Sequence, residues 1–269
     1  MKIIDAHLHF FDKPNFDSLA LAAGHENSAA HLKKVFCKNN IAHAVVMGNG
    51  GISFSEHDYP DFVSFCIGIN ADQLRPEAYD DSVSLAEEQL RLPACAGIKL
   101  YPGYTHHYVF EPLYEPFFAL SRKYGKPVAV HTGATAGTMG ILKYSHPLTL
   151  DETAIKYPDV SIVMCHFGNP WLTDAAALMA KNRNISTDLS GILEGKPDIG
   201  NFAVKYLSYI EYIKTWLQYV NSYDRIMFGT DWPLVNIPSY IAFTKLLIPE
   251  EYWENVFFKS ANTIYRLGL

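Results

Sequence analysis

The sequence has few cysteines, little excess of basic charge and no long apolar runs. Its four cysteines, Cys37, Cys66, Cys95 and Cys165, share no short paired spacing, which argues against a disulfide framework or a zinc knuckle and predicts reduced thiols in the core. Lys and Arg number 22 against 28 Asp and Glu, a net charge of -6 with no basic stripe. Nucleic acid and anionic membranes are therefore poor candidates for the partner, and a small-molecule substrate is favoured.

No segment has the pattern of a membrane span. The longest stretch free of Lys, Arg, Asp and Glu, residues 39–55, is interrupted by His43, Asn49 and three glycines. The first ten residues carry Asp5, His7 and His9, where a signal peptide requires an uninterrupted apolar core. We therefore expect a cytoplasmic protein without a membrane segment.

What the sequence does contain is an alternation of short β-rich runs with longer helical patterns, and 49% of its 269 residues are hydrophobic. Eight strands are predicted, at residues 2–8, 43–47, 62–69, 96–100, 127–131, 160–165, 185–188 and 225–228. Helical patterns occupy residues 28–38, 81–91, 112–124, 148–156, 171–181 and 202–221. This alternation predicts a closed (β/α)8 TIM barrel forming one domain over residues 1–269, with a doubly wound sheet as the alternative.

Residues able to carry chemistry stand at the ends of the predicted strands. His7 and His9 project on the same face of the first strand, because side chains alternate along a strand. Alone, this pair is equally compatible with a structural role. His131, His166 and Asp231 follow three later apolar strands. In a barrel all strands end at one rim, so these five side chains should converge there. Their nitrogen and oxygen donors suit a zinc-like ion.

Several of these segments also resemble a known family, the amidohydrolase-2 branch of the amidohydrolase superfamily. The similar segments are residues 5–9, 131–133, 165–171, 228–233 and 260–265. The resemblance implies a metal-dependent TIM barrel in which the ligands are His7, His9, His131 and Asp231. One divalent ion, with zinc favoured, is the expectation for this branch, and a second metal stays open.

The expected chemistry follows from such a donor set. Three or four ligands leave a position for water, whose pKa then falls to roughly 7. Asp231 is suited to accept the proton of that water and return it to the leaving group. For His166 three roles remain open, namely orienting the water, polarising the substrate or binding a second metal.

Lys99, at the end of the fourth predicted strand, has three interpretations. It could contact substrate or water, pair with a carboxylate inside the barrel, or be carbamylated and bridge two metals as in binuclear members of the superfamily; we favour the first. Loops after the fourth, fifth and eighth strands supply further candidates for substrate contact, although the loop at 132–146 could equally be plain surface. These candidates are Tyr101, Lys143, Tyr144, His146 and Trp232.

The leading functional hypothesis is hydrolysis of a small-molecule amide, ester or lactone. The resemblance also includes nonoxidative decarboxylases and hydratases of small carboxylic acids. Arginine is the usual partner of a carboxylate, and only Arg75 lies in a loop after a strand, which mildly favours hydrolysis. A non-enzymatic metal-binding barrel is least favoured, because a structural site does not need both His166 and Asp231. The tyrosine-rich stretch at 206–219 leaves a homodimer open.

Overall fold

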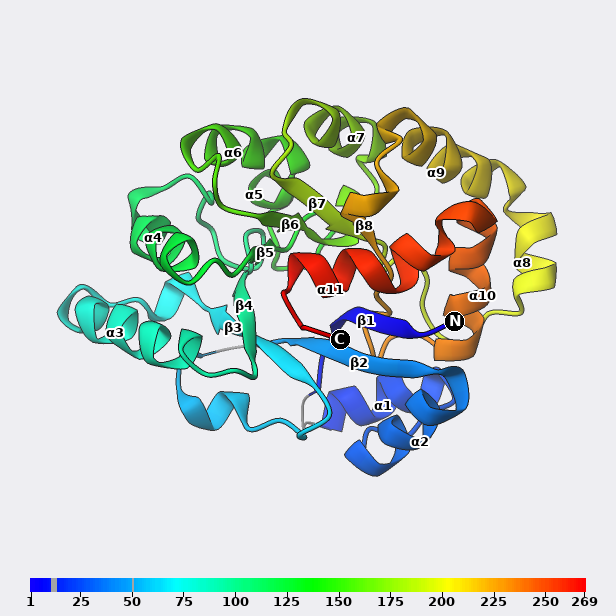
Figure 1. Cartoon of the computed structure of the whole chain (residues 1–269), viewed down its shortest axis with the longest axis horizontal. Helices are drawn as coiled ribbons and strands as arrows, with labels where there is room; N and C mark the ends of the chain where they lie inside the picture. Colours follow the sequence, from blue (N-terminus) through cyan, green and yellow to red (C-terminus); the bar gives the residue numbers. More distant parts are fainter. Residues whose placement is uncertain (11–13, 50) are drawn as a thin grey trace.

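The fold is an eight-stranded parallel barrel, which confirms the predicted TIM barrel and excludes the doubly wound sheet. The computed structural model describes residues 1–10, 14–49 and 51–269. Its strands follow chain order around one sheet (Figure 1). They are β1 (Ile3–Leu8), β2 (Ile41–Met47), β3 (Ser64–Ile69), β4 (Cys95–Leu100), β5 (Val128–Val130), β6 (Ile162–Met164), β7 (Ile185–Asp188) and β8 (Ile226–Met227). Each lies where the alternation of the sequence predicted a strand.

The last strand returns to the first through backbone hydrogen bonds. The amide of Ala6 donates to the carbonyl of Phe228 at 2.9 Å, and the amide of His9 donates to that of Trp232 at 2.7 Å. Closure leaves no free parallel edge on the sheet. It also places the segments that follow β1 and β8 side by side at the carboxyl ends of the strands.

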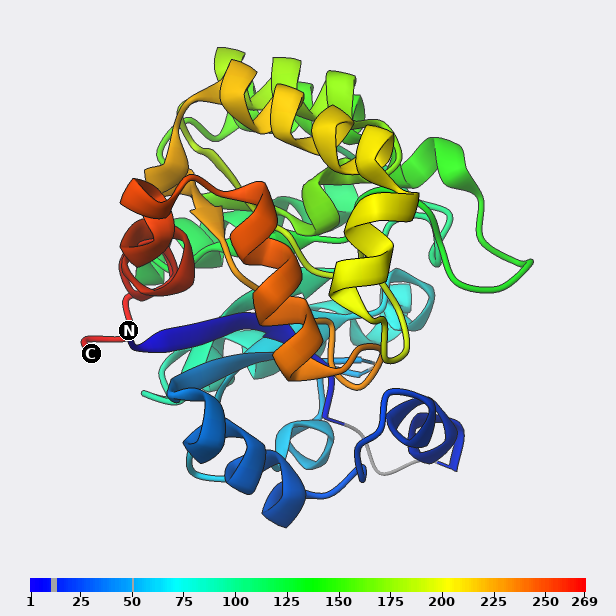
Figure 2. The ribbon, with the colours of Figure 1, turned by 90° about the vertical axis from the view of Figure 1, so that its right-hand side faces the viewer.

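Helices surround this barrel (Figure 2). They are α1 (Pro14–Ala22), α2 (Ala29–Asn39), α3 (Tyr79–Leu90), α4 (Glu115–Tyr124), α5 (Leu142–Ser145), α6 (Asp151–Lys156), α7 (Leu172–Lys181), α8 (Ile199–Lys205), α9 (Leu207–Val220), α10 (Ile237–Leu247) and α11 (Ser260–Ile264). In the described part of the link from β2 to β3, residues 48–49 and 51–63, the helical element is a 3-10 turn, Phe54–His57, in agreement with the loop that its glycines and Pro60 predicted. None of the described helices has both the length and the apolar character that crossing a bilayer requires.

One predicted helix is divided in two. The pattern at 202–221 was expected to form a continuous helix, but α8 ends at Lys205 and α9 begins at Leu207, with Tyr206 in a non-helical conformation (φ -115°, ψ 30°). The two helices also differ in burial. Ile210 and Leu217 of α9 are buried, whereas Phe202 and the other apolar residues of α8 that contact the core are only partly buried.

The barrel interior is closed at one end by α11, which lies across the strands in Figure 1. Ala261 of α11, and Tyr265 just after the helix, pack against inward-facing apolar residues such as Ile4 and Val45. Among the predicted core thiols, three are buried and free, whereas Cys37 is exposed. That prediction was wrong because Cys37 lies on the outer face of α2, whose buried residues are Leu32 and Phe36.

Candidate active site

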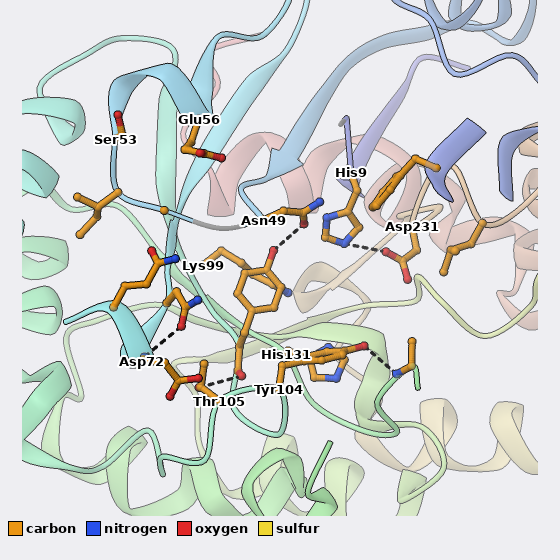
Figure 3. Close-up of a pocket in the computed structure, with 18 of the residues that line it drawn as sticks. His9, Asn49, Ser53, Glu56, Asp72, Lys99, Tyr104, Thr105, His131 and Asp231 are labelled. Atoms are coloured by element: carbon orange, nitrogen blue, oxygen red, sulfur yellow. Dashed lines mark hydrogen bonds and ion pairs between the residues drawn. The ribbon is translucent and has the colours of Figure 1, made fainter. Parts of the chain in front are cut away.

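The carboxyl ends of the strands bring the five predicted side chains together. His7 lies in β1, with His9 just beyond it, while His131, His166 and Asp231 follow β5, β6 and β8. The ring centroid of His166 lies 4.8 Å from that of His7 and 5.1 Å from that of His131. Figure 3 marks the contact between His9 and Asp231 with a dashed line and shows His131 in the same cavity. Convergence at the rim was therefore predicted correctly from strand ends alone.

His7 and His9 both direct Nε2 toward one oxygen of Asp231. The distances from Asp231 Oδ1 are 3.5 Å to His7 Nε2 and 3.1 Å to His9 Nε2. One ligand atom from each of the three residues lies within 4.8 Å of the others, a spacing that can hold a metal ion. The geometry is fixed by the closure of the barrel, because the amide of Asp231 donates to the carbonyl of His7 at 2.8 Å.

The other ring nitrogen of each histidine is already occupied. His9 Nδ1 lies 3.1 Å from the carbonyl oxygen of Met47, and His7 Nδ1 lies 3.0 Å from Asp188 Oδ2. Since both partners are acceptors, Nδ1 is the protonated nitrogen in each neutral ring, and Nε2 presents a lone pair. Burial lowers the pKa of His7 to about 4, which favours that neutral form. The lone pair of His7 Nε2 thus faces the carboxylate of Asp231, and His9 Nε2 points to the same carboxylate oxygen.

Asp188 accepts hydrogen bonds from several residues of the site. Burial raises its pKa, but His7 and the hydrogen bond from that ring hold the pKa well below its usual value, so the group is a carboxylate. Its Oδ1 accepts the backbone amide of His166 at 3.1 Å and that of Ser190 at 3.1 Å, as well as the hydroxyl of Ser190. This residue was missed from the sequence, although a carboxylate ending the seventh predicted strand was a usable signal.

His166 is held in one orientation. Its Nδ1 lies 3.2 Å from the carbonyl oxygen of Ser190 and 2.8 Å from Ser190 Oγ, whose own hydrogen goes to Asp188. Nδ1 is therefore the donor and Nε2 is free to accept. His166 and Asp231 have φ values of 62° and 58°, in the left-handed region that non-glycine residues seldom adopt. Such backbone conformations cluster at functional sites.

The residues present fit a divalent ion. Among the described residues, His7 Nε2 and His131 Nε2 are buried without a hydrogen-bond partner. Burial lowers the pKa of His131 well below its ordinary value, so its ring is neutral and can donate a lone pair. Imidazole nitrogens with one carboxylate form the donor set that zinc-like ions accept, and a cation there would separate Asp231 from the facing lone pairs.

A cavity of about 940 Å³ opens over these residues. Lys99 and Tyr101 line it together with His9, His131 and Asp231. The Lys99 ammonium is fully buried and donates to Cys165 Sγ at 2.9 Å; it forms no ion pair with a carboxylate in the part of the chain that the structure describes. The Tyr101 hydroxyl donates to the carbonyl of Gly48 at 2.6 Å.

The other residues considered for substrate contact lie outside the cavity lining. The ring of Tyr144 stacks on that of His106, and Lys143 is exposed with its ammonium 4.8 Å from the Tyr144 centroid. His146 Nε2 lies 3.5 Å from Asp174 Oδ2. Lys143 and Tyr144 lie in the short helix α5, in which Ser145 is the buried residue.

Trp232 also lies outside the cavity lining, despite its place beside Asp231. Its side chain is fully buried, and its ring centroid lies 4.8 Å from that of His25. A lining residue that was not singled out is Tyr104, whose ring centroid lies 4.8 Å from that of His131. The amide of Ala136 donates to its hydroxyl oxygen at 2.8 Å, which leaves the O–H free for a ligand.

Comparison with known proteins places this geometry in context. The model of the family described as Amidohydrolase matches residues 4–267. No curated protein matches the chain significantly. An uncharacterised TIM-barrel protein from Bordetella bronchiseptica is 18% identical, with a TM-score of 0.73 and 99% of each chain covered.

Two further solved structures share the fold and carry different activities in their names. The 5-carboxyvanillate decarboxylase of Sphingomonas paucimobilis is 14% identical, with a TM-score of 0.62 over 98% of this chain and 99% of the other. A probable 2-pyrone-4,6-dicarboxylic acid hydrolase from Acinetobacter baumannii is 14% identical, with a TM-score of 0.65 over 99% and 100%. At these identities the likeness is one of fold.

Proposed function

Because the chain belongs to the amidohydrolase family, we propose that it is a metal-dependent hydrolase of a small-molecule amide, ester or lactone. The observation that carries the proposal is that the Nε2 atoms of His7 and His9 both face Asp231 Oδ1 at the edge of a large cavity. Two imidazoles and one carboxylate form a donor set that suits a divalent cation between them. The cavity above them provides room for a substrate.

The ligands in this proposal are His7, His9, His131 and Asp231, and zinc suits their nitrogen and oxygen donors best. When bound, a divalent ion would polarise a substrate carbonyl and make a nearby water more acidic. Asp231 accepts the proton of the attacking water and delivers it to the leaving group. A second metal is not needed for these steps.

His166 and Lys99 complete the proposed machinery. With Nδ1 of His166 held by Ser190, its Nε2 accepts a hydrogen bond and orients the attacking water. The buried ammonium of Lys99 lines the same cavity and is suited to contact the polar group of the substrate. Tyr101 is the remaining predicted substrate residue in the lining, and we assign it a wall position beside Lys99.

The assembly in this proposal rests on the surface pattern. Exposed apolar side chains on α8 and α9, among them Val204 at 83% and Tyr219 at 59% exposure, are compatible with a homodimer.

Nonoxidative decarboxylation or hydration of a small carboxylic acid is the second candidate, with the same residues. The observation that favours it is Lys99, a buried cation suited to a substrate carboxylate. A screen of the purified, metal-supplemented protein separates the candidates. Esters, lactones and amides are followed by acid release, and benzoate-type and muconate-type acids by carbon dioxide release. Gas release without hydrolysis would reverse the ranking, and no turnover of any substrate would favour a non-enzymatic barrel.

A further inference from the structure

The cavity is electrically asymmetric. Glu56 and Asp72 are among the residues that line it, together with Asn70 and Gln73. Figure 3 shows Glu56 and Asp72 on the side of the cavity away from His9 and Asp231. We call Glu56 and Asp72 the outer carboxylates.

Nothing in the described residues neutralises the outer carboxylates. Neither Glu56 nor Asp72 forms an ion pair there, and no arginine is among the described residues that line the cavity. Among the described residues that line the cavity, Lys99 is the one lysine, and its ammonium donates a hydrogen bond to Cys165 Sγ. The two outer carboxylates, both exposed, therefore give this side of the cavity a negative potential.

The segment that carries Glu56 is held in place from below. His57 Nδ1 donates to the carbonyl of Ser53 at 3.0 Å, and the amide of Gly68 in β3 donates to His57 Nε2 at 3.2 Å. The amide of Glu56 donates to the same Ser53 carbonyl at 3.0 Å. Asp72 lies in a short turn, and its backbone amide donates to Asn70 Oδ1 at 3.0 Å. Both carboxylates thus stand on braced turns.

At the inner end of the cavity, the buried Lys99 ammonium favours a negatively charged or electron-rich ligand group. Lys99 is 0% exposed, and among the described residues the hydrogen-bond acceptor of its ammonium is one thiol, a weak acceptor. An ammonium has three donors, and a buried cation is stabilised when an anion or oxygen acceptor meets it. This ammonium, with one weak acceptor for its three donors, points to an electron-rich ligand group at the inner end.

We propose that the substrate is bipolar, with its reacting carbonyl or carboxylate at Lys99 and a protonated amine at the outer carboxylates. The inference rests on the proposed function for the inner end and adds the charge of the distal group. An ammonium gains from Glu56 and Asp72, whereas a second carboxylate is repelled by both. The cavity therefore selects an amine-bearing acid derivative over a diacid of the same length.

Equilibrium binding tests this without relying on turnover. Isothermal titration calorimetry of the metal-supplemented protein compares 6-aminohexanoate, hexanoate and adipate, which share a carboxylate and differ in the distal group. We expect 6-aminohexanoate to bind about tenfold more tightly than adipate, with hexanoate between them, and the ratio to shrink as salt rises. Equal binding of the three, or tighter binding of adipate, would overturn the proposal.

Variants connect the preference to the outer carboxylates. The double variant Glu56→Gln with Asp72→Asn should bring the ratio near unity, whereas the control Glu88→Gln, an exposed acid on α3 outside the lining, should leave it unchanged. An unaltered ratio in the double variant contradicts the proposal. If the protein hydrolyses 4-nitrophenyl esters with no preference for the charge of the distal group, the proposal of a bipolar substrate is wrong and the proposed hydrolase activity is retained. If the protein binds 6-aminohexanoate preferentially but hydrolyses no ester, the hydrolase proposal is wrong and the charge preference of the cavity is retained.

Discussion

Asp188 and His7 form a buried pair in which Asp188 Oδ2 lies 3.0 Å from His7 Nδ1, while His7 Nε2 on the other side of the ring has no hydrogen-bond partner among the described residues. The pair fixes the tautomer of the imidazole and the direction of its lone pair. Carboxylates that orient metal-binding histidines act in this way. A residue outside the proposed ligand set thus orients one of the proposed ligands.

Replacing Asp188 by Asn should weaken metal binding. The amide no longer supplies a charged acceptor to His7 Nδ1, so the metal affinity should fall by roughly 10- to 100-fold. Competition with a chromophoric chelator measures the loss. Asp198→Asn, at the N-cap of α8, is the matched control and should retain the affinity. Wild-type affinity in Asp188→Asn would mean that the pair serves packing alone.

Replacing Asp231 by Asn should abolish turnover while the fold is kept. The amide preserves the shape but can no longer take a proton from water, so the rate should fall by at least about 100-fold under hydrolysis or decarboxylation. Steady-state kinetics give the rate, and circular dichroism with a thermal melt checks the fold. Undiminished activity would refute the proton transfer assigned to this side chain.

Gly191 should not tolerate a side chain. It has a φ of +66°, and a Cβ atom there would lie 2.8 Å from His166 Nδ1 and 2.9 Å from Asp231 Oδ2. Gly191→Ala should therefore displace both groups, with a large loss of activity and metal affinity. Gly195→Ala is the control, since its φ of +71° gives similar backbone strain, but the nearest atom to its Cβ is 4.0 Å away. Equal activity in the two variants would show that the contact is unimportant.

His25 should make the protein less stable in acid. Burial lowers its pKa from 6.5 to about 4, with His31 and Lys196 as the neighbouring positive charges. The folded pKa lies below the unfolded one, so the unfolded chain binds the proton first. The contribution of His25 to the free energy of unfolding is fully present above pH 6.5. It decreases by roughly 3 kcal/mol as the pH falls toward 4.

Urea unfolding of wild type and His25→Gln over this pH range isolates the contribution of His25. The variant should show a flatter dependence of the free energy of unfolding on pH. If the two proteins have the same slope, the proton uptake on unfolding comes from other groups.

The strand pattern was sufficient to predict the barrel and the convergence of its histidines. His7, His131 and Asp231 stand at or beside strand ends, and closure of the sheet brings these ends to one rim whatever the loops do. Asp188 was missed because a lone carboxylate after a strand has many possible roles in a sequence, and its partner His7 is remote along the chain.

The loop residues could not be predicted in the same way. Tyr144 and Trp232 both lie in segments that follow strands, yet one stacks on His106 and the other is buried against His25. Their directions depend on turns and on packing partners that a short pattern does not encode. The same limit applies to Glu56, whose position depends on the turn braced by His57.

The central claim is that His7, His9, His131 and Asp231 hold a divalent metal on which activity depends. Elemental analysis of the purified protein, followed by chelation and resupply of Zn, Mn, Fe or Co, tests it most directly. We predict one ion per chain, loss of activity on chelation and recovery with one of these metals. Protein without any bound ion and without activation by any of the four would contradict the account.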